Sequence, residues 1–241
     1  MDSTVNLIPV RMKATRFPNK PFALIGDLPM FHYVYQKAVN IFPNTYLAIC
    51  DEEVHKYCDE KNLKYVMTDP NHLSGSDRIG EAIKLLESEL NFNKVINIQG
   101  DMPFIKKEHL IKLNSQLDDF KMTTLGCPFV DIEEAKNTSK VKVKISGKDD
   151  FVADNFFREY SDQSKINEDT FHHIGVYGYQ KSFLIEYISL PPTQWEQEEK
   201  LEQLRVIDKI KISVGLIDEE ILGVDTKEDL DRVNRLIQND V

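Results

Sequence analysis

Residues 7–21 have the sequence LIPVRMKATRFPNKP, in which an apolar segment suited to a β-strand stops at a proline and a short basic loop follows. The loop carries four cations, Arg11, Lys13, Arg16 and Lys20, although the whole chain has a formal net charge of -10. Open α/β sheets bind ligands at the carboxyl ends of their strands. Cationic side chains and backbone N–H groups placed there suit a polyphosphate. The stretch therefore predicts an α/β sheet whose first loop binds an anion, and a solvated basic surface loop is the alternative interpretation.

Strand-like and helix-like segments alternate through the first half of the chain. Four apolar segments predict strands: Val5–Pro9, Tyr46–Cys50, Leu63–Met67 and Lys94–Ile98. Segments with apolar residues at helical spacing separate them, and we expect Ser76 to cap the third such helix. This alternation implies right-handed crossovers and a mostly parallel, Rossmann-like sheet flanked by helices.

The pattern changes after residue 120, where helices become less regular. Three segments there predict strands: Met122–Cys127, Val141–Ile145 and His173–Tyr179. Residues 146–171 are polar and are expected to be irregular. We expect one domain spanning residues 1–241, with a smaller inserted α+β region at residues 122–210.

Two helices are expected near the C-terminal end. The first follows Pro192 and continues through Leu204, and its acidic run at residues 196–202 predicts a solvated face. The second begins at Thr226, which with Asp229 forms a variant of the capping box.

Composition limits the function classes. With 241 residues, 41% of them hydrophobic and 29% charged, the chain suits one ordinary globular α/β domain. Its acidic charge argues against general nucleic-acid binding, which needs a basic face. The three cysteines are dispersed and odd in number, and no apolar run reaches membrane-spanning length. We therefore expect a cytoplasmic protein without membrane insertion.

Two aspartates are candidate metal ligands. Asp101 follows an apolar strand in the sequence Gln99-Gly100-Asp101, and Asp225 precedes the last helix. Mg²⁺ bound to a nucleotide prefers one or two carboxylates together with phosphate oxygens and water. A turn aspartate and a residue at a helix start are the alternative interpretations, so the metal assignment depends on both carboxylates reaching one pocket.

Two further segments have the composition of ligand sites. Ser74-Gly75 and Arg78 lie between a strand and a helix, where backbone N–H groups and hydroxyls can meet a base or a phosphate, although an ordinary helix cap is the alternative. His173 and Tyr177 share one face of a predicted strand. A hydrogen-bonded core histidine is the alternative interpretation there.

Six segments in order resemble the 3-deoxy-manno-octulosonate (Kdo) cytidylyltransferase family, also called CMP-Kdo synthetases. They are residues 8–21, 74–79, 97–103, 173–179, 199–205 and 224–226. The resemblance extends over residues 5–237. It implies a Mg²⁺-dependent enzyme that transfers CMP from CTP to the anomeric hydroxyl of a 2-keto-3-deoxy sugar acid, for bacterial surface polysaccharide. It also implies a homodimer formed through residues 122–210, which would carry the sugar site.

The resemblance also implies a role for each matching residue. The nucleotide would be bound by Pro9, Val10, Arg11, Lys20, Ser74, Gly75, Arg78 and Asp101. The catalytic group would be Arg11, Arg16, Lys20, Asp101 and Asp225, the two aspartates being the ligands of Mg²⁺. The sugar acid would be surrounded by Gln99, Arg158, His173, Tyr177, Glu202 and Gln203.

Two departures from the family pattern bear on these roles. Asn19 stands where the first loop usually has a glycine, and Asn155–Tyr160 stands in place of a Ser-Arg-Ala-Pro-Ile-Pro segment, with Arg158 replacing its arginine after a shift of register. The second departure concerns the sugar end. A modified octulosonate or a nonulosonate is therefore an alternative substrate. A nucleotide-binding relative without catalysis is an alternative function. A sugar-1-phosphate nucleotidyltransferase fits the motifs less well.

Overall fold

The computed structural model describes residues 3–13, 17–72, 74–146, 151–160 and 169–239. Its contacts divide the chain into two units. Unit 1 contains Met1–Leu110 and Ile221–Val241, and unit 2 contains Ile111–Glu220. Residues 122–210 thus fall entirely within unit 2. Among the described residues, no helix combines the length and the apolar character needed to cross a membrane.

Four parallel strands form the sheet of unit 1, in the order β5-β4-β1-β6. Their bounds are β1 Thr4–Pro9, β4 Thr45–Ile49, β5 Tyr65–Met67 and β6 Lys94–Asn97. Leu7 is central, pairing with Tyr46 on one side and Asn97 on the other. The strands predicted from apolar runs in this half are confirmed. Since β1 and β6 are parallel neighbours, the basic loop after β1 and Asp101 after β6 leave the same edge of the sheet.

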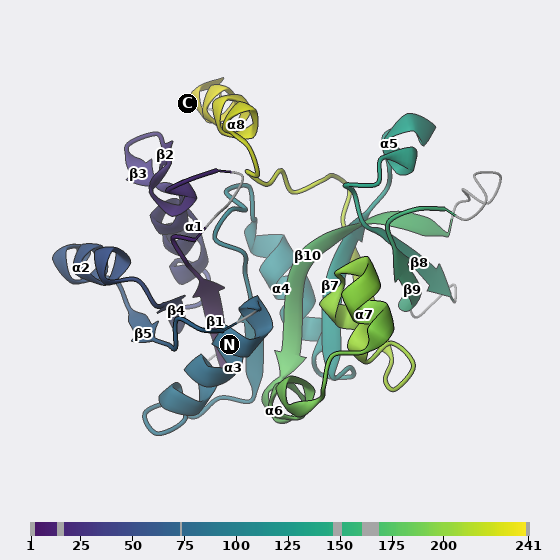
Figure 1. Ribbon diagram of the computed structural model, residues 1–241, viewed down its shortest axis with the longest axis horizontal. Coiled ribbons are helices and arrows are strands. Elements are labelled where there is room, and N and C mark those ends of the chain that lie inside the picture. Colours follow the sequence, from purple (N-terminus) through teal and green to yellow (C-terminus); the bar gives the residue numbers. More distant parts are fainter. Residues whose placement is uncertain (1–2, 14–16, 73, 147–150, 161–168, 240–241) are drawn as a thin grey trace. The chain divides into compact units, whose positions relative to one another are not determined.

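Helices and a small hairpin complete unit 1. Their bounds are η1 Lys20–Phe22, β2 Leu24–Ile25, β3 Leu28–Pro29, α1 Met30–Val39, α2 Glu52–Lys61, α3 Gly75–Leu86 and α8 Lys227–Asn239. The expected capping box of α8 is confirmed, because Thr226 Oγ1 accepts from Asp229 N and Asp229 Oδ2 accepts from Thr226 N. Asn234 of α8 also bonds the backbone of the β2–β3 hairpin, which lies beside α8 (yellow) in Figure 1.

The cap of α3 differs from the expectation. Ser74, not Ser76, is the N-cap, and its Oγ accepts a hydrogen bond from Asp77 N at 3.1 Å. Ser74 has the extended backbone that a capping residue needs, whereas Ser76 is already in the first helical turn and is buried.

Unit 2 has a mixed sheet, in the order β10-β7-β11-β9-β8, in which β10 also pairs with β8. The strand bounds are β7 Met122–Cys127, β8 Lys142–Ser146, β9 Val152–Phe157, β10 Thr170–Gln180 and β11 Ile212–Leu216. Its helices are α5 Ile132–Lys136, α6 Lys181–Ser189, α7 Gln194–Glu199 and η3 Glu202–Arg205. Helix α4 (Lys107–Gln116) contains the passage from unit 1 to unit 2. Figure 1 draws most of unit 2 in teal and green.

Three expectations for unit 2 are wrong. The expectation of irregular structure over residues 146–171 missed β9, which pairs with β8. The helix after Pro192 ends at Glu199, because Lys200 adopts a left-handed conformation with φ 55, and a separate 3-10 turn follows. The acidic run is not wholly solvated either, since Glu196 is buried against Arg205.

Candidate functional site

A cavity of 810 Å³ lies in unit 1, where β1 and β6 end. The predicted residues that line it are Pro9, Val10, Arg11, Lys20, Arg78, Gln99, Asp101 and Asp225. An adjoining cavity of 140 Å³ shares five of these residues and adds Ser74 and Gly75. Every residue predicted to bind the nucleotide or the metal therefore lines one of the two cavities. Of the predicted catalytic group, Arg16 lies outside the described residues.

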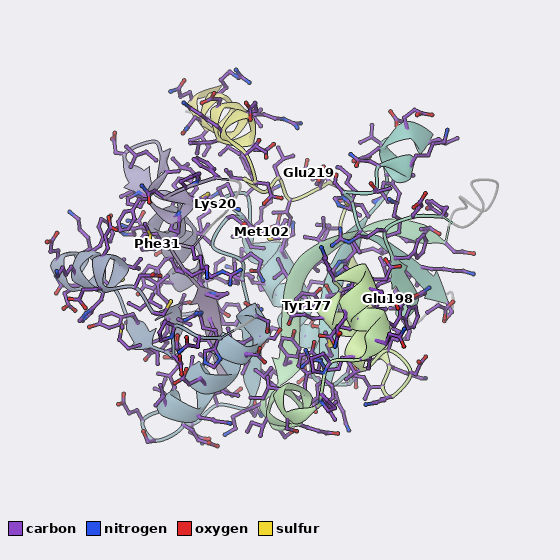
Figure 2. The ribbon with its side chains drawn as sticks, in the orientation of Figure 1. Lys20, Phe31, Met102, Tyr177, Glu198 and Glu219 are labelled. Carbon is purple, nitrogen blue, oxygen red and sulfur yellow. The ribbon has the colours of Figure 1, made fainter. Side chains whose placement is uncertain are left out.

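Lys20 joins the two predicted metal ligands. Its Nζ lies 2.6 Å from Asp101 Oδ2 and 3.2 Å from Asp225 Oδ1, so both carboxylates converge on one position that a cation occupies. The backbone holds them together as well, because Val224 N donates to Asp101 O at 3.0 Å. Lys20 is labelled in Figure 2 and begins η1.

Asn19 sets the direction in which Lys20 leaves the loop. It has a left-handed backbone with φ 57, a conformation that glycine adopts freely and that asparagine tolerates better than most residues. The departure from the family's glycine at this position is therefore compatible with the loop geometry.

Asp51 and His72 are among the cavity-lining residues that were not predicted from the sequence. Asp51 follows β4 and its Oδ2 accepts from Met12 N at 2.8 Å, which holds the basic loop against the sheet edge. His72 lines the cavity from the segment between β5 and α3. Asp51 and Asp101 share one sequence signal, because each is a carboxylate that follows an apolar parallel strand within a few residues. For His72 the sequence contained no comparable signal.

Arg78 lines both cavities and is only 2% exposed. Its Nη1 donates to Thr68 Oγ1, whose hydroxyl donates in turn to Ile49 O at 2.8 Å. A buried guanidinium held in this way presents a fixed positive charge and N–H donors to the cavity.

The residues predicted to bind the sugar acid divide between the units. Gln99 lines the cavities of unit 1, and the others lie in unit 2. In unit 2, Tyr177 OH donates to Gln203 Oε1 at 3.0 Å, and the rings of Tyr177 and His173 are 5.5 Å apart between centroids. Burial raises the pKa of Tyr177 well above its ordinary value, so the phenol stays protonated. Tyr177 is labelled on β10 in Figure 2.

Arg158 and Glu202 lie in the same part of unit 2. Arg158 Nε donates to Glu199 O at 2.9 Å. Its charge adds to the effect of burial in lowering the pKa of His173, and it opposes part of the rise that burial causes in the pKa of Tyr177. Glu202 begins η3 beside Gln203, and its backbone oxygen accepts from Tyr187 OH at 2.7 Å. The structure thus brings together a phenol, an imidazole, an amide and a guanidinium.

His173 is a neutral donor in this cluster. The Thr124 hydroxyl donates to Val176 O at 2.9 Å, so Thr124 Oγ1 accepts from His173 Nε2–H, also at 2.9 Å. Burial, assisted by the neighbouring His172 and Arg158, lowers the pKa of His173 to about 3. The ring is therefore uncharged at neutral pH.

This buried imidazole predicts loss of stability in acid. The unfolded chain binds a proton near pH 6.5 and the folded ring only near 3, so protonation favours unfolding as the pH falls through this interval. One such group contributes a slope of about 1.4 kcal/mol per pH unit. We expect His173→Gln, which keeps an N–H donor, to reduce by about that amount the pH dependence of the unfolding free energy measured with urea between pH 6.5 and 4.5. The control is His55→Gln on α2. If the unfolding free energy of His173→Gln depends on pH as steeply as that of this control, His173 is not the buried neutral group responsible.

Unit 2 also contains a cluster of three side chains of the kinds that bind metals, and the ammonium group of Lys140 contacts two of them. Glu134, His172 and Glu220 have ligand atoms within 4.8 Å of one another. Lys140 Nζ contacts Glu220 at 2.7 Å and Glu134 at 2.5 Å, so an ammonium group already neutralises these carboxylates. Those ion pairs raise the pKa of Lys140 against the opposing effect of its burial.

Comparison with known proteins places these features in a family. A family model described as cytidylyltransferase matches residues 5–213. The 3-deoxy-manno-octulosonate cytidylyltransferase of Leptospira biflexa is 36% identical over 96% of this chain and 95% of its own length. The chain belongs to the Kdo cytidylyltransferase family.

Other members agree in sequence and in fold. The 3-deoxy-manno-octulosonate cytidylyltransferase of Rhodopseudomonas palustris (strain BisB5) is 37% identical over 97% of both chains. A solved structure of CMP:2-keto-3-deoxy-manno-octonic acid synthetase, complexed with CTP, superposes with a TM-score of 0.88 at 30% identity over 99% of both chains. The chain therefore has the α/β nucleotidyltransferase fold of Kdo cytidylyltransferases.

Proposed function

We propose that the protein transfers CMP from CTP to the anomeric hydroxyl of Kdo and releases pyrophosphate. The observation that carries this proposal is the cavity of unit 1, where basic side chains from the first loop face two converging carboxylates in a member of the Kdo cytidylyltransferase family. A triphosphate needs cationic partners and a metal-binding position close to them. The residues that line the cavity of unit 1 offer both.

Mg²⁺ is proposed as the cofactor, with Asp101 and Asp225 as its ligands. The donor set fits, because Mg²⁺ binds hard carboxylate oxygens and completes its octahedron with water and substrate phosphate. The contacts of Lys20 with both carboxylates support the idea that one cation can be shared at this position. When bound, Mg²⁺ would neutralise negative charge that develops on the phosphates.

The sugar acid is proposed to bind the polar cluster of unit 2. Gln203 is 1% exposed, and its Nε2 has no hydrogen-bond partner among the described residues. Its Oε1 is already used by Tyr177. A buried amide donor without a partner is costly, so an acceptor from a ligand, such as a sugar hydroxyl or carboxylate oxygen, would satisfy it. The guanidinium of Arg158 suits the carboxylate of the sugar acid.

In the proposed reaction, the anomeric oxygen forms a bond to the α-phosphorus while the bond from that phosphorus to the bridging oxygen of pyrophosphate breaks. The hydroxyl proton is lost, and pyrophosphate leaves with the electron pair. Arg11 and Lys20 would bind and orient the phosphates, so their fixed charges favour the pentavalent arrangement over the free triphosphate. Catalysis of such a transfer depends mainly on positioning and on charge stabilisation.

The test is pyrophosphate release with CTP, Mg²⁺ and Kdo, beside mixtures that lack the sugar or replace CTP with UTP. We expect release only when CTP and a sugar acid are both present. If CTP binds but Kdo gives no product, amino-substituted octulosonates and nine-carbon acids are tried next, because Asn155–Tyr160 replaces the family's usual segment. CTP binding without turnover of any sugar acid would favour a nucleotide-binding relative without catalysis.

Three further proposals extend this function. A role in bacterial lipopolysaccharide synthesis follows from the expected product, and a cytoplasmic location follows from the substrate CTP.

A homodimer is supported by the exposed apolar side chains of Val130 and Ile132 in unit 2, which are 88% and 60% exposed. Light scattering after gel filtration would measure the mass, and a value near that of one chain would exclude the dimer.

A further inference from the structure

One buried cation of unit 2, Lys142, has no role in the function proposed so far. It lies on β8, where it pairs with Phe157 of β9 on one side and with His172 of β10 on the other. The residue is 0% exposed, although a lysine is almost never fully buried unless partners balance its charge. Its position inside the sheet of unit 2 therefore needs a reason.

The ammonium group of Lys142 is bonded by the main chain. Its Nζ donates to three backbone oxygens, those of Asn137 at 2.5 Å, Lys140 at 2.8 Å and Arg158 at 2.8 Å. These bonds use all three N–H groups of an ammonium, so the geometry requires the protonated form. Lys142 thus acts as a fixed monovalent cation that ties the turn at residues 137–140 to the residue directly after β9.

Arg158 is held at two points as a result. Lys142 fixes its carbonyl oxygen, and its own Nε donates to Glu199 O at 2.9 Å, where α7 ends. One anchor acts on the main chain and the other on the side chain, so together they limit the positions that the guanidinium can take. A cation fixed in this way binds an anion with little loss of conformational entropy.

The charges around Lys142 also favour an anion beside Arg158. Burial lowers the pKa of Lys142, and the charge of Arg158 adds to this effect, while Glu159 opposes it. The lysine and the arginine therefore repel each other across a short distance. An anionic ligand at the guanidinium would relieve part of this repulsion.

The sequence of the segment shows why such an anchor is useful. The family's usual Ser-Arg-Ala-Pro-Ile-Pro segment has two prolines, whose rings restrict the backbone, whereas residues 151–160 contain no proline. We propose that Lys142 is a positioning residue, which holds the backbone of Arg158 so that its guanidinium binds the carboxylate of the sugar acid. This inference rests on the proposed function for the identity of that ligand.

Binding of the sugar acid tests the inference apart from turnover. Kdo is titrated calorimetrically into the whole protein with Mg²⁺ and the α,β-methylene analogue of CTP, which cannot release pyrophosphate. We expect Lys142→Met to raise the Kd of Kdo about tenfold, because the guanidinium then has to be ordered during binding. The affinity for the CTP analogue should not change, since the residues that line its proposed cavity lie in unit 1. If the wild type does not bind Kdo, an amino-substituted octulosonate and a nonulosonate replace it.

Two further variants keep this test sharp. Lys144→Met is the matched control, because Lys144 lies on the same strand but is exposed, and it should leave the Kd of the sugar acid unchanged. Lys142→Gln keeps N–H donors without the charge. It should weaken binding in the same direction but less, and it provides the measurement if Lys142→Met does not fold.

A double-mutant cycle separates positioning from a general loss of structure. Arg158→Met removes the group that would contact the ligand, so the Kd of the sugar acid should rise by about tenfold or more. Adding Lys142→Met to Arg158→Met should raise it no further, because the residue through which Lys142 acts is already gone. A defect unrelated to Arg158 would instead add to the loss.

Three results would overturn the proposal: an unchanged Kd in folded Lys142→Met or Lys142→Gln, losses that add in the double variant, and a wild type that binds no sugar acid. If binding follows the expectation but no sugar acid releases pyrophosphate, the inference about Lys142 stands and the proposed transferase function fails. If pyrophosphate is released with the same KM for the sugar acid in wild type and Lys142→Met, the function stands and the inference fails.

Discussion

Replacing Asp101 with asparagine is expected to lower pyrophosphate release about a thousandfold while the protein stays folded. Asparagine keeps the shape of the side chain, and the backbone oxygen that accepts from Val224 N is untouched. The change removes one of the two negative charges that converge on the position of Lys20 Nζ. A shared metal would lose a charged ligand, and Lys20 would lose the carboxylate that lies 2.6 Å from its Nζ.

Three measurements define the outcome for Asp101→Asn. Pyrophosphate release gives turnover, thermal unfolding shows that the fold is kept, and titration with Mn²⁺ in the presence of CTP reports metal binding apart from catalysis. Asp208→Asn is the matched control, because Asp208 undergoes the same chemical change at an exposed position of unit 2. Full activity in Asp101→Asn, or unchanged Mn²⁺ affinity, would rule out the metal role.

The second large effect is expected on stability, from Arg205→Met. Arg205 and Glu196 form an ion pair with two hydrogen bonds, and their side chains are 4% and 7% exposed. The guanidinium also lies 4.9 Å from the ring centre of Tyr187. Removing it would leave the Glu196 carboxylate buried without its counter-charge. Breaking such a pair costs about 3–5 kcal/mol, which is a large share of the stability of a typical domain.

Urea unfolding at neutral pH measures this loss. The double variant Arg205→Met with Glu196→Gln should recover part of the stability, because the remaining side chain is then neutral. Arg235→Met is the control, since Arg235 is exposed on α8, and it should change the unfolding free energy by less than about 0.5 kcal/mol. A loss in Arg205→Met no greater than in this control would show that the pair contributes little.

The strands of unit 1 could be predicted because their apolar runs are local and continuous. The same argument identified Asp101, since the loop that follows a parallel strand lies at the ligand-binding edge of the sheet. Asp225 could not be derived in this way. From its own segment Asp225 was a candidate with a helix start as the alternative, and the resemblance implied that it shares a metal with Asp101. It reaches the same edge because Val224 N bonds Asp101 O across a long sequence separation.

The errors in unit 2 have similar causes. In β9 the buried residues are Ala153 and Phe156, three apart, because a bulge opposite Lys144 and Ile145 interrupts the alternation of period two that identifies a strand. Glu196 was expected to be solvated because it belongs to an acidic run. Its buried partner, Arg205, comes after the left-handed residue Lys200 ends the helix, so no helical spacing links the two residues. In both cases the structure depends on a contact between residues whose spacing in the sequence follows neither the strand nor the helix period.

Unit 1 is built from two pieces of chain separated by the whole of unit 2. The second piece supplies Asp225 to the cavity and packs Val224 and Val233 against Ile25 and Met30. During synthesis the strands whose ends line the cavity therefore leave the ribosome long before the residues that complete it. A nascent chain that has emerged only as far as Glu220 carries the basic loop without its second carboxylate. The lining of the cavity is thus completed late in translation, after unit 2 has had time to fold.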